Sequence, residues 1–580
     1  MRAKTTLIAA ALMLLPALAG GQYRTLDDRF PAPAFTSRAG WEQRAAFLRE
    51  HILASAGLLP MPEKTPLNAM VFGERQHDGY SVAKVHFESL PGFFVTGNLY
   101  RPAGSGPFPA VLSPHGHWTY GRLENSPLVS GPGRAINLAR QGIVVFTYDM
   151  IGYNDSRQLT HTFGGPREHL WGLSLAGLQL WNSIRGLDFL ETLPYVKRGA
   201  IGITGESGGG TQTFMLAAVD SRVATAVPVN MVSLHMQGGC LCENPPGLRL
   251  DTTNAEIAAT IAPRPLLLVS ATGDWTAETL EVEYPAVRAL YALVGAEDRV
   301  GAVRFTADHN YNKDSREAMY GWMARWLKNA PPAARVAEAG FSPDPLPDLL
   351  VFHGRALPEP AATAASLTAD WIARAKRQLA DASLAVRGSA LRHALGFGGN
   401  TAPRPAARTP QSARQPVVLV AGDQPDVVAR LRKAGHTVRP VTFTPHDQAA
   451  AEKIRHFETY NRTPASQRVA DIVSALRAEP GAILVAAGDA ALAGALAAAI
   501  EPPRLAVLDV GGFSTADDDA YLSRLYMPGL RRAGDLRTAS DLAQGRLAIH
   551  NAGAVFDAPG ARVQQATLSP SEIAALVRQP

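Results

Sequence analysis

Residues 199–210 place a serine among the glycines that a catalytic turn requires. The segment reads Gly-Ala-Ile-Gly-Ile-Thr-Gly-Glu-Ser-Gly-Gly-Gly, so Ser207 lies in a Gly-x-Ser-x-Gly motif. A strand-like run precedes the motif and an Ala-rich helical pattern follows it, which predicts a sharp strand-to-helix turn. At such a turn Gly205 and Gly209 avoid collisions that a Cβ atom would make with neighbouring backbone. We therefore expect Ser207 to be a nucleophile held in a strained, exposed conformation.

Two later residues suit the other members of a serine-based triad. His309 follows a short strand pattern and lies in a polar loop, where an imidazole can take the proton of Ser207. Asp274 follows the apolar run 266–271, so its carboxylate can orient that imidazole. The order serine, acid, histidine is the one expected when the serine lies at a strand–turn–helix elbow. Glu278, one helical turn after Asp274, is the alternative acid.

The negatively charged intermediate of acyl transfer needs two backbone N–H donors. We expect one from Gly208, directly after the serine, and the other from His117 or Trp118 in the loop Pro-His-Gly-His-Trp that follows a buried strand pattern. His115 and His117 could alternatively be two ligands of a metal ion. No histidine or aspartate set of suitable spacing follows them, so we expect no metal and no other cofactor.

Three side chains are expected to contact the substrate. Trp118 and Trp275 follow the histidine-containing loop and Asp274, where their rings could stack on a sugar, although burial in a core is the more common position of a tryptophan. Glu206, inside the serine motif, is the third.

Alternating strand and helix patterns in the first half predict an α/β fold with a mostly parallel sheet. Strand patterns and helical patterns follow one another in an order that ends with the His309 loop and a closing helix. The strands are expected at 82–88, 93–100, 109–113, 142–149, 223–229, 265–271 and 304–307, and the helices at 135–141, 173–193 and 315–327.

With these motifs, residues 41–327 resemble the α/β-hydrolase superfamily. Within it the His-Gly-His loop, Asp149 with the Gly152 loop, and the Ser207, Asp274 and His309 segments are similar to the acetyl xylan esterase and dienelactone hydrolase-like branch. The resemblance implies a doubly wound sheet and hydrolysis of a small-molecule or polysaccharide ester. A serine peptidase related to prolyl oligopeptidase and a non-catalytic binding protein are the alternatives.

The second half repeats the pattern of the first. The runs at 416–421 and 431–438 match those at 109–114 and 138–145, and the segment 482–492 stands where the serine motif was, with Ala490 in place of Ser207. We therefore expect a second, degenerate α/β-hydrolase-like domain that has lost its nucleophile.

Composition and the N-terminus set the remaining expectations. Arg2 and Lys4 precede an apolar run that ends in Ala-Leu-Ala at 17–19, which is typical of a cleaved export signal and predicts a periplasmic or secreted protein. The net charge of +5 over 580 residues includes no dense basic run, so nucleic acid is not an expected partner. No later segment has 18 unbroken apolar residues, so no stable membrane insertion is expected. The expected division is a signal peptide at 1–19, a catalytic domain at 20–330, a helical and Pro/Ala/Arg-rich linker at 331–415, and the degenerate domain at 416–580.

The two cysteines of the chain, Cys240 and Cys242, leave two alternatives open. Export would permit a local disulfide, which would close a tight ring and lock a loop. Free thiols are the other alternative. A structural zinc site is not expected, because two cysteines are too few ligands and no histidine lies close to them in sequence.

Overall fold

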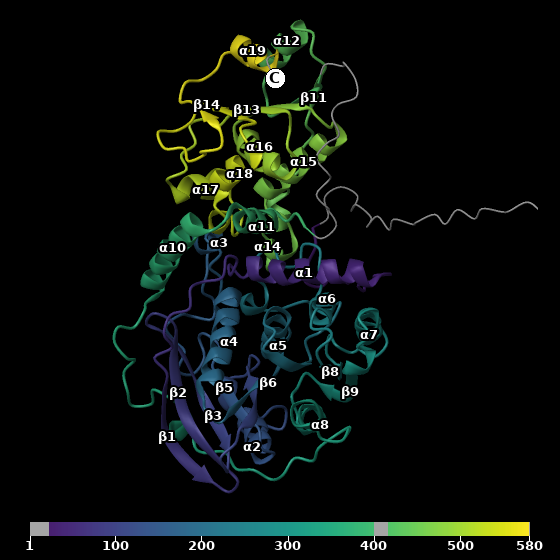
Figure 1. Cartoon of the computed structure of the whole chain (residues 1–580), viewed down its shortest axis with the longest axis vertical. Coiled ribbons are helices and arrows are strands. Elements are labelled where there is room, and N and C mark those ends of the chain that lie inside the picture. Colours follow the sequence, from purple (N-terminus) through teal and green to yellow (C-terminus); the bar gives the residue numbers. More distant parts are fainter. Residues whose placement is uncertain (1–22, 399–415, 579–580) are drawn as a thin grey trace, which may run out of the picture.

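The computed structural model describes residues 23–398 and 416–578, which form two sheets covered by helices (Figure 1). The expected signal peptide at 1–19 and the linker residues 399–415 lie outside the described residues. Among the described residues, no helix combines the length and the hydropathy needed to cross a bilayer.

The first half contains a nine-stranded sheet in the order β1-β2-β3-β5-β4-β6-β7-β8-β9. The pairs β1–β2, β2–β3 and β3–β5 are antiparallel, and all pairs from β5 to β9 are parallel. The carboxyl ends of the parallel strands therefore meet at one edge, where ligand sites of open α/β sheets form. The strands are β1 (Met70–His77), β2 (Tyr80–Leu90), β3 (Phe93–Pro102), β4 (Phe108–Ser113), β5 (Val144–Tyr148), β6 (Val196–Glu206), β7 (Val223–Val229), β8 (Leu266–Gly273) and β9 (Val300–Asp308).

Helices cover both faces of this sheet because its strands are apolar on both sides. Along β4, Ala110 and Leu112 pack in the core that includes α4 and α5, whereas Val111 packs in the core that includes α2 and α8. The helices of this half are α1 (Arg38–Ser55), α2 (Gly131–Arg140), α3 (Pro166–Leu170), α4 (Leu175–Thr192), α5 (Gly208–Val219), α6 (Asn254–Ala259), α7 (Glu283–Leu293), α8 (Lys313–Lys328) and α9 (Leu346–Leu349), with short 3-10 turns η1 (Gly121–Leu123), η2 (Leu241–Glu243) and η3 (Glu297–Arg299).

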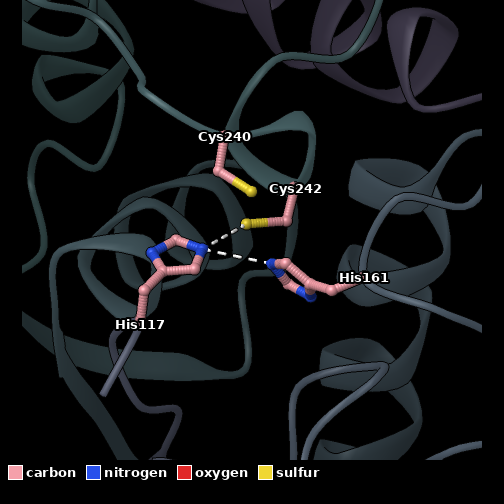
Figure 2. A group of neighbouring side chains, drawn as sticks. All are labelled: His117, His161, Cys240 and Cys242. Carbon is pink, nitrogen blue, oxygen red and sulfur yellow. Dashed lines mark hydrogen bonds between the residues drawn. The ribbon is translucent and has the colours of Figure 1, made fainter. Parts of the chain in front are cut away.

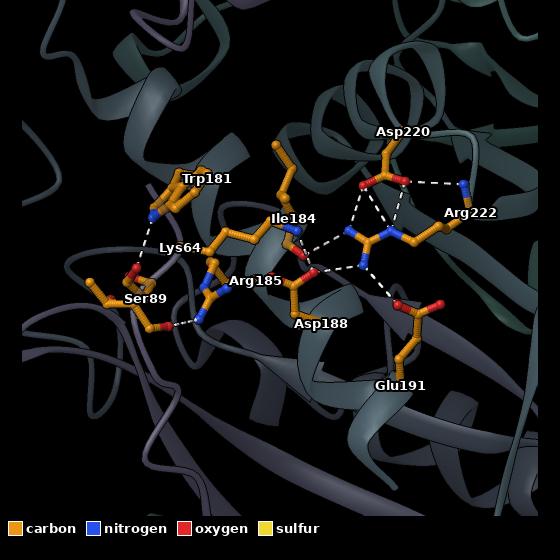
Figure 3. Close-up of polar contacts among 10 residues, drawn as sticks. Lys64, Ser89, Trp181, Ile184, Arg185, Asp188, Glu191, Asp220 and Arg222 are labelled. Carbon is orange, nitrogen blue, oxygen red and sulfur yellow. Dashed lines mark hydrogen bonds and ion pairs between the residues drawn. The ribbon is translucent and has the colours of Figure 1, made fainter. Parts of the chain in front are cut away.

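An ion-pair network holds the C-terminal part of α4 near the amino ends of the parallel strands (Figure 3). Arg222, just before β7, binds Asp188 and Glu191 of α4 at 2.6 and 2.9 Å and Asp220 at 2.6 Å. Lys64 also binds Asp188, at 2.8 Å. Because α4 leads into β6, this network helps to set the strand that carries the serine motif.

The second half contains a six-stranded, fully parallel sheet in the order β11-β10-β12-β13-β14-β15. Its strands are β10 (Val418–Ala421), β11 (Val438–Pro440), β12 (Ile483–Ala487), β13 (Leu505–Asp509), β14 (Leu547–His550) and β15 (Arg562–Val563). The buried side chains of α10 (Ala364–Asp381) pack in the core of the first half. The other helices of the second half are α11 (Leu384–Ala394), α12 (Pro425–Lys433), α13 (Gln448–Ala451), α14 (Phe457–Tyr460), α15 (Pro464–Ala478), α16 (Asp489–Ile500), α17 (Asp518–Arg524), α18 (Asp535–Ala543) and α19 (Pro570–Arg578), with the 3-10 turn η4 (Arg531–Ala533).

The six strands have the order of β5-β4-β6-β7-β8-β9 in the first sheet. Gly488, between β12 and α16, has φ 62° and ψ −134°, close to the φ 56° and ψ −122° of Ser207 between β6 and α5. Gly488 therefore takes the elbow position, and the expected pairing of Ala490 with Ser207 is wrong by two residues. The same strand order also occurs in unrelated doubly wound folds, so a hydrolase origin of this half stays a prediction.

The two halves stack along the long axis of the molecule, with α1 and α14 at their junction (Figure 1). Backbone hydrogen bonds cross it, from Gly247 to Glu458 at 2.8 Å and from Arg249 to Thr459 at 3.0 Å. Arg532 of the second half donates to the carbonyl of Gly57 at 3.0 Å. The junction is thus built from directed polar contacts as well as apolar packing.

Because His51 is buried at this junction, we expect the folded protein to lose stability in acid. Burial, and then the neighbouring His393, lower the pKa of His51 to about 4. Its neutral form therefore stabilises the fold above its ordinary pKa, and this contribution is lost as the pH falls through about 4. We expect His51→Gln, whose amide can replace the donor to the Leu248 carbonyl, to show a shallower decrease in the free energy of unfolding between pH 6.5 and 4.

Denaturant titrations across this pH range measure the effect, which is about 1.4 kcal/mol per pH unit for one group. His235→Gln is the control, because His235 is exposed. Equal pH slopes in wild type and His51→Gln would contradict the assignment.

Candidate active site

Ser207 lies at a strained turn between β6 and α5. Its φ of 56° is in a region that non-glycine residues rarely adopt, and its N–H donates to the carbonyl of Val229 at 3.1 Å. A Cβ at Gly205 would lie 2.5 Å from the carbonyl oxygen of Pro114 and 2.7 Å from that of Gly209. Three backbone segments therefore approach one another closely at this turn, and any side chain at position 205 would prevent that approach.

Asp274 and His309 are hydrogen-bonded to each other. His309 Nδ1 lies 2.8 Å from Asp274 Oδ2, and the Asp274 side chain is 2% exposed. Its other oxygen accepts hydrogen bonds from the N–H of Thr276 at 2.7 Å and from the Thr276 hydroxyl at 2.5 Å. The carboxylate is thus fixed by its own loop, and it leaves Nε2 of His309 as the nitrogen that can accept a proton.

The residues after His309 anchor its loop in the core. Asn310 is fully buried, and its side-chain oxygen accepts hydrogen bonds from the N–H of Asn312 at 2.9 Å and the hydroxyl of Ser315 at 3.1 Å. The hydroxyls of Tyr311 and Thr204 are 2.6 Å apart, which ties this loop to β6. These contacts therefore fix the position of the loop that carries His309.

Both tryptophans that were expected at the site lie beside His309. The ring of Trp275 is 4.5 Å from the His309 ring, and the ring of Trp118 is 6.3 Å away in a stacked orientation. The same loop also lies close to the serine, because a Cβ atom placed on Gly116 would be 3.2 Å from Ser207 Cβ. Ser207 follows β6 and His309 follows β9, so both lie at the carboxyl edge of the sheet, and the loop after β4 lies close to each of them.

Glu206 differs from its expected role. Its side chain is 1% exposed and pairs with Arg134 at 2.8 Å. Its other oxygen accepts hydrogen bonds from the N–H of Gly116 at 3.0 Å and the indole N–H of Trp118 at 2.9 Å. Burial and complete pairing leave this carboxylate no free oxygen for a substrate, so Glu206 positions the loop after β4 instead. Sequence reasoning did not identify Arg134, since its burial depends on tertiary packing.

The expected oxyanion donors have suitable surroundings. Gly208 begins α5, so its N–H is one of the first four, which have no partner inside a helix. His115 is held by backbone on both sides, with Nδ1 2.7 Å from the Gly116 carbonyl and Nε2 accepting from the N–H of Met150 at 2.9 Å. These bonds fix the shape of the loop that carries His117 and Trp118. They also exclude the alternative in which His115 binds a metal together with His117.

The alternative acid, Glu278, does not approach His309. Its side chain is 54% exposed and pairs with Arg29 at the surface. Asp274 is the carboxylate that contacts the imidazole.

Four potential metal ligands that are distant in sequence meet beside the active site (Figure 2). His117 Nε2 lies 3.2 Å from His161 Nε2 and 3.1 Å from Cys242 Sγ, and the ligand atoms of these three residues and Cys240 all lie within 4.8 Å of one another. The structure contains no bond between the two cysteines, which agrees with the free-thiol alternative. Hydrogen bonds to Cys242, and then to His117 and His161, lower the pKa of the Cys240 thiol, whereas burial raises the pKa of Cys242. The expectation that no histidine lies near the cysteines is therefore wrong in space, and along the chain it overlooked His235, five residues before Cys240.

Comparison with known proteins agrees with this architecture. No protein-family model matches the chain. It is 27% identical over 257 residues to the putative hydrolase YtaP of Bacillus subtilis (strain 168), which covers 41% of this chain and 84% of that protein. The solved structure of methylesterase BT1017 has a TM-score of 0.50 and 28% identity, and covers 60% of this chain and 78% of that one. A putative acetyl xylan esterase from Bacteroides fragilis NCTC 9343 has a TM-score of 0.40 and 18% identity, and covers 48% and 80%. The α/β-hydrolase fold expected of the first half of the chain is confirmed.

The pairing of Glu206 with Arg134 yields a prediction. We expect Glu206→Gln to lower the free energy of unfolding by about 3 kcal/mol, because it leaves the buried Arg134 without a counter-charge. We also expect a lower kcat for ester hydrolysis, because the loop that is expected to supply the second oxyanion donor loses an anchor. Chemical denaturation and steady-state kinetics measure the two effects.

Glu278→Gln is the matched control, since it removes the same charge from an exposed glutamate. It should leave both quantities within error of wild type. Equal stability of Glu206→Gln and Glu278→Gln would show that the buried pair does not support the loop.

Proposed function

We propose that this carboxylic ester hydrolase of the α/β-hydrolase type is an exported serine esterase acting on a decorated carbohydrate. The hydrogen bond between Asp274 and His309, together with a serine at a strained elbow at the same edge of the sheet, carries the proposal. The pattern at residues 2–19 supports export. The solved structure with 28% identity, which is named a methylesterase, supports ester hydrolysis.

In the proposed reaction Ser207 attacks the ester carbonyl while Nε2 of His309 takes the serine proton. Asp274 holds the imidazole by Nδ1 and stabilises its charged form. The N–H groups of Gly208 and of His117 or Trp118 stabilise the oxyanion. His309 then protonates the leaving alcohol, and a water molecule activated by the same histidine releases the acid from the acyl-enzyme.

Two senses of the ester bond fit this mechanism. In one, an acetyl group is carried by a sugar hydroxyl, as the resemblance to acetyl xylan esterases implies. In the other, the sugar carries the carboxyl group and methanol leaves, which the methylesterase comparison favours. The rings of Trp118 and Trp275 beside His309 could stack on the sugar in either case.

Hydrolysis of p-nitrophenyl acetate tests the nucleophile. We expect the mature protein to be active and Ser207→Ala to lose activity to the background rate, while its melting temperature changes little because alanine is smaller than serine. Full activity of Ser207→Ala would contradict the mechanism.

The role of the acid is tested separately. Asp274→Asn should lower kcat by about 10⁴-fold, because the amide no longer holds the required tautomer of His309. Glu278→Gln should keep wild-type kcat. Loss of activity in Glu278→Gln with an active Asp274→Asn would reverse the assignment of the acid.

A substrate panel separates the two ester senses. Acetylated xylan and a methyl-esterified polyuronate are incubated with wild type and Ser207→Ala, and released acetate and methanol are quantified. Release of neither product, together with hydrolysis of a peptide substrate, would favour the peptidase alternative.

A further inference from the structure

The four residues of the histidine–cysteine cluster, His117, His161, Cys240 and Cys242, come from three connections at the carboxyl edge of the first sheet. His117 follows β4, His161 lies between β5 and α3, and the cysteines lie between β7 and α6. In Figure 2 all four side chains point toward a common centre. The topology of the sheet brings the three connections together, because β4, β5 and β7 end at this edge.

Two separations between ligand atoms are close to those expected around a single tetrahedral ion. For zinc bonds of about 2.05 Å to nitrogen and about 2.3 Å to sulfur, tetrahedral geometry places two nitrogens about 3.4 Å apart and a nitrogen and a sulfur about 3.6 Å apart. The observed separations are 3.2 Å between the two Nε2 atoms and 3.1 Å from His117 Nε2 to Cys242 Sγ. For these two pairs, an ion would require separations larger by only a few tenths of an ångström, and the other ligand atoms of the cluster lie within 4.8 Å of one another.

A second contact prepares His161 for coordination. Its Nδ1 lies 2.6 Å from the carbonyl oxygen of Ile151, so Nδ1 carries the proton and donates it. The lone pair is then on Nε2, the atom that faces His117 and the cysteines. A backbone acceptor on the far nitrogen is the usual outer-shell support of a metal-binding histidine.

The cysteine loop is also preorganised. The Glu243 carboxylate accepts hydrogen bonds from the N–H groups of Gly239 at 2.7 Å and Cys240 at 2.9 Å. Asn244 donates to the carbonyl of Cys240 at 2.8 Å. The hydroxyl of Tyr460, in the second half of the chain, donates to the side-chain oxygen of Asn244 at 3.0 Å. Both halves of the chain therefore hold the cysteines in place.

We propose that His117, His161, Cys240 and Cys242 form a zinc site that cross-links the loops around Ser207. Two imidazoles and two thiolates are a typical structural zinc set, and the two thiolate charges neutralise the ion. Binding releases the proton of any ligand thiol that is protonated.

Such a site would act on the active centre through His117. A Cβ at Gly208 would lie 2.6 Å from Cε1 of His117, so the imidazole packs directly against the residue after the nucleophile. Zinc would fix this ring, and with it the backbone of the loop that supplies the second oxyanion donor. This consequence rests on the proposed esterase function, whereas zinc binding itself does not.

Metal binding is tested on the mature protein under reducing conditions. Bound metal is removed with a chelator, and the apoprotein is titrated with zinc in competition with a chromophoric chelator. The amount of zinc bound per chain is measured by inductively coupled plasma mass spectrometry. We expect one zinc per chain with a dissociation constant below about 1 µM. The variants Cys240→Ser and His161→Ala should bind at least about 100-fold more weakly.

His235→Ala is the matched control, because His235 is an exposed histidine in the same connection as the cysteines and should leave the affinity unchanged. Cobalt in place of zinc should give thiolate-to-metal absorption that Cys240→Ser weakens. The titration of the wild-type protein decides the matter even if a variant fails to fold.

Three results would overturn the proposal. They are no stoichiometric zinc binding by the reduced wild-type protein, unchanged affinity in either ligand variant, and a Cys240–Cys242 disulfide in the protein as isolated, seen as a mass two hydrogens lower before reduction. If zinc binds, its removal should lower kcat for p-nitrophenyl acetate with a smaller change in KM, and added zinc should restore it. An inactive protein that still binds zinc would contradict the esterase function alone.

Discussion

The close approach of three backbone segments at Ser207 is the constraint on which the site depends. The end of β6, the start of α5 and the loop after β4 meet where a Cβ at Gly205 would lie 2.5 Å from the carbonyl oxygen of Pro114. The packing holds Ser207 at a φ of 56°, a strained conformation that persists only when its surroundings enforce it. The buried pair of Glu206 and Arg134 reinforces this geometry, because Glu206 also binds the loop after β4.

The second half of the chain contacts the connection between β7 and α6, which lies at the same edge of the first sheet. The segment around Thr459 and Tyr460 contacts Asn244 and Arg249, which in turn hold the connection that carries the cysteines. Gly488 has the elbow conformation but no side chain that could act as a nucleophile. The contacts of Thr459 and Tyr460 give the second half a structural role: it supports the cysteine-containing connection and needs no catalytic residues of its own for this.

Local patterns were sufficient for the residues that end strands. Asp274 and His309 could be predicted because each directly follows a strand, and the carboxyl ends of parallel strands share one edge. The predicted strands and helices of the first half recur with boundaries shifted by a few residues. Glu206 was misassigned because burial and pairing with Arg134 depend on packing that one sequence does not display.

The histidine–cysteine cluster could not be predicted for a related reason. His117 is 44 residues from His161 and 125 residues from Cys242, so their spacing matches no compact zinc motif. Only the strand order brings the three connections together. The Ala490 pairing failed because an alanine-rich helix start provides no local marker, whereas the backbone identifies Gly488.

Labelling with a fluorophosphonate tests the central claim most directly, because this reagent forms a covalent bond only with an activated serine. The account predicts one adduct per chain, located on Ser207 by peptide mass spectrometry, and no adduct after Ser207→Ala or His309→Ala substitution. An unlabelled but folded wild-type protein, or an adduct on a different serine, would contradict the assignment of this site as the catalytic centre.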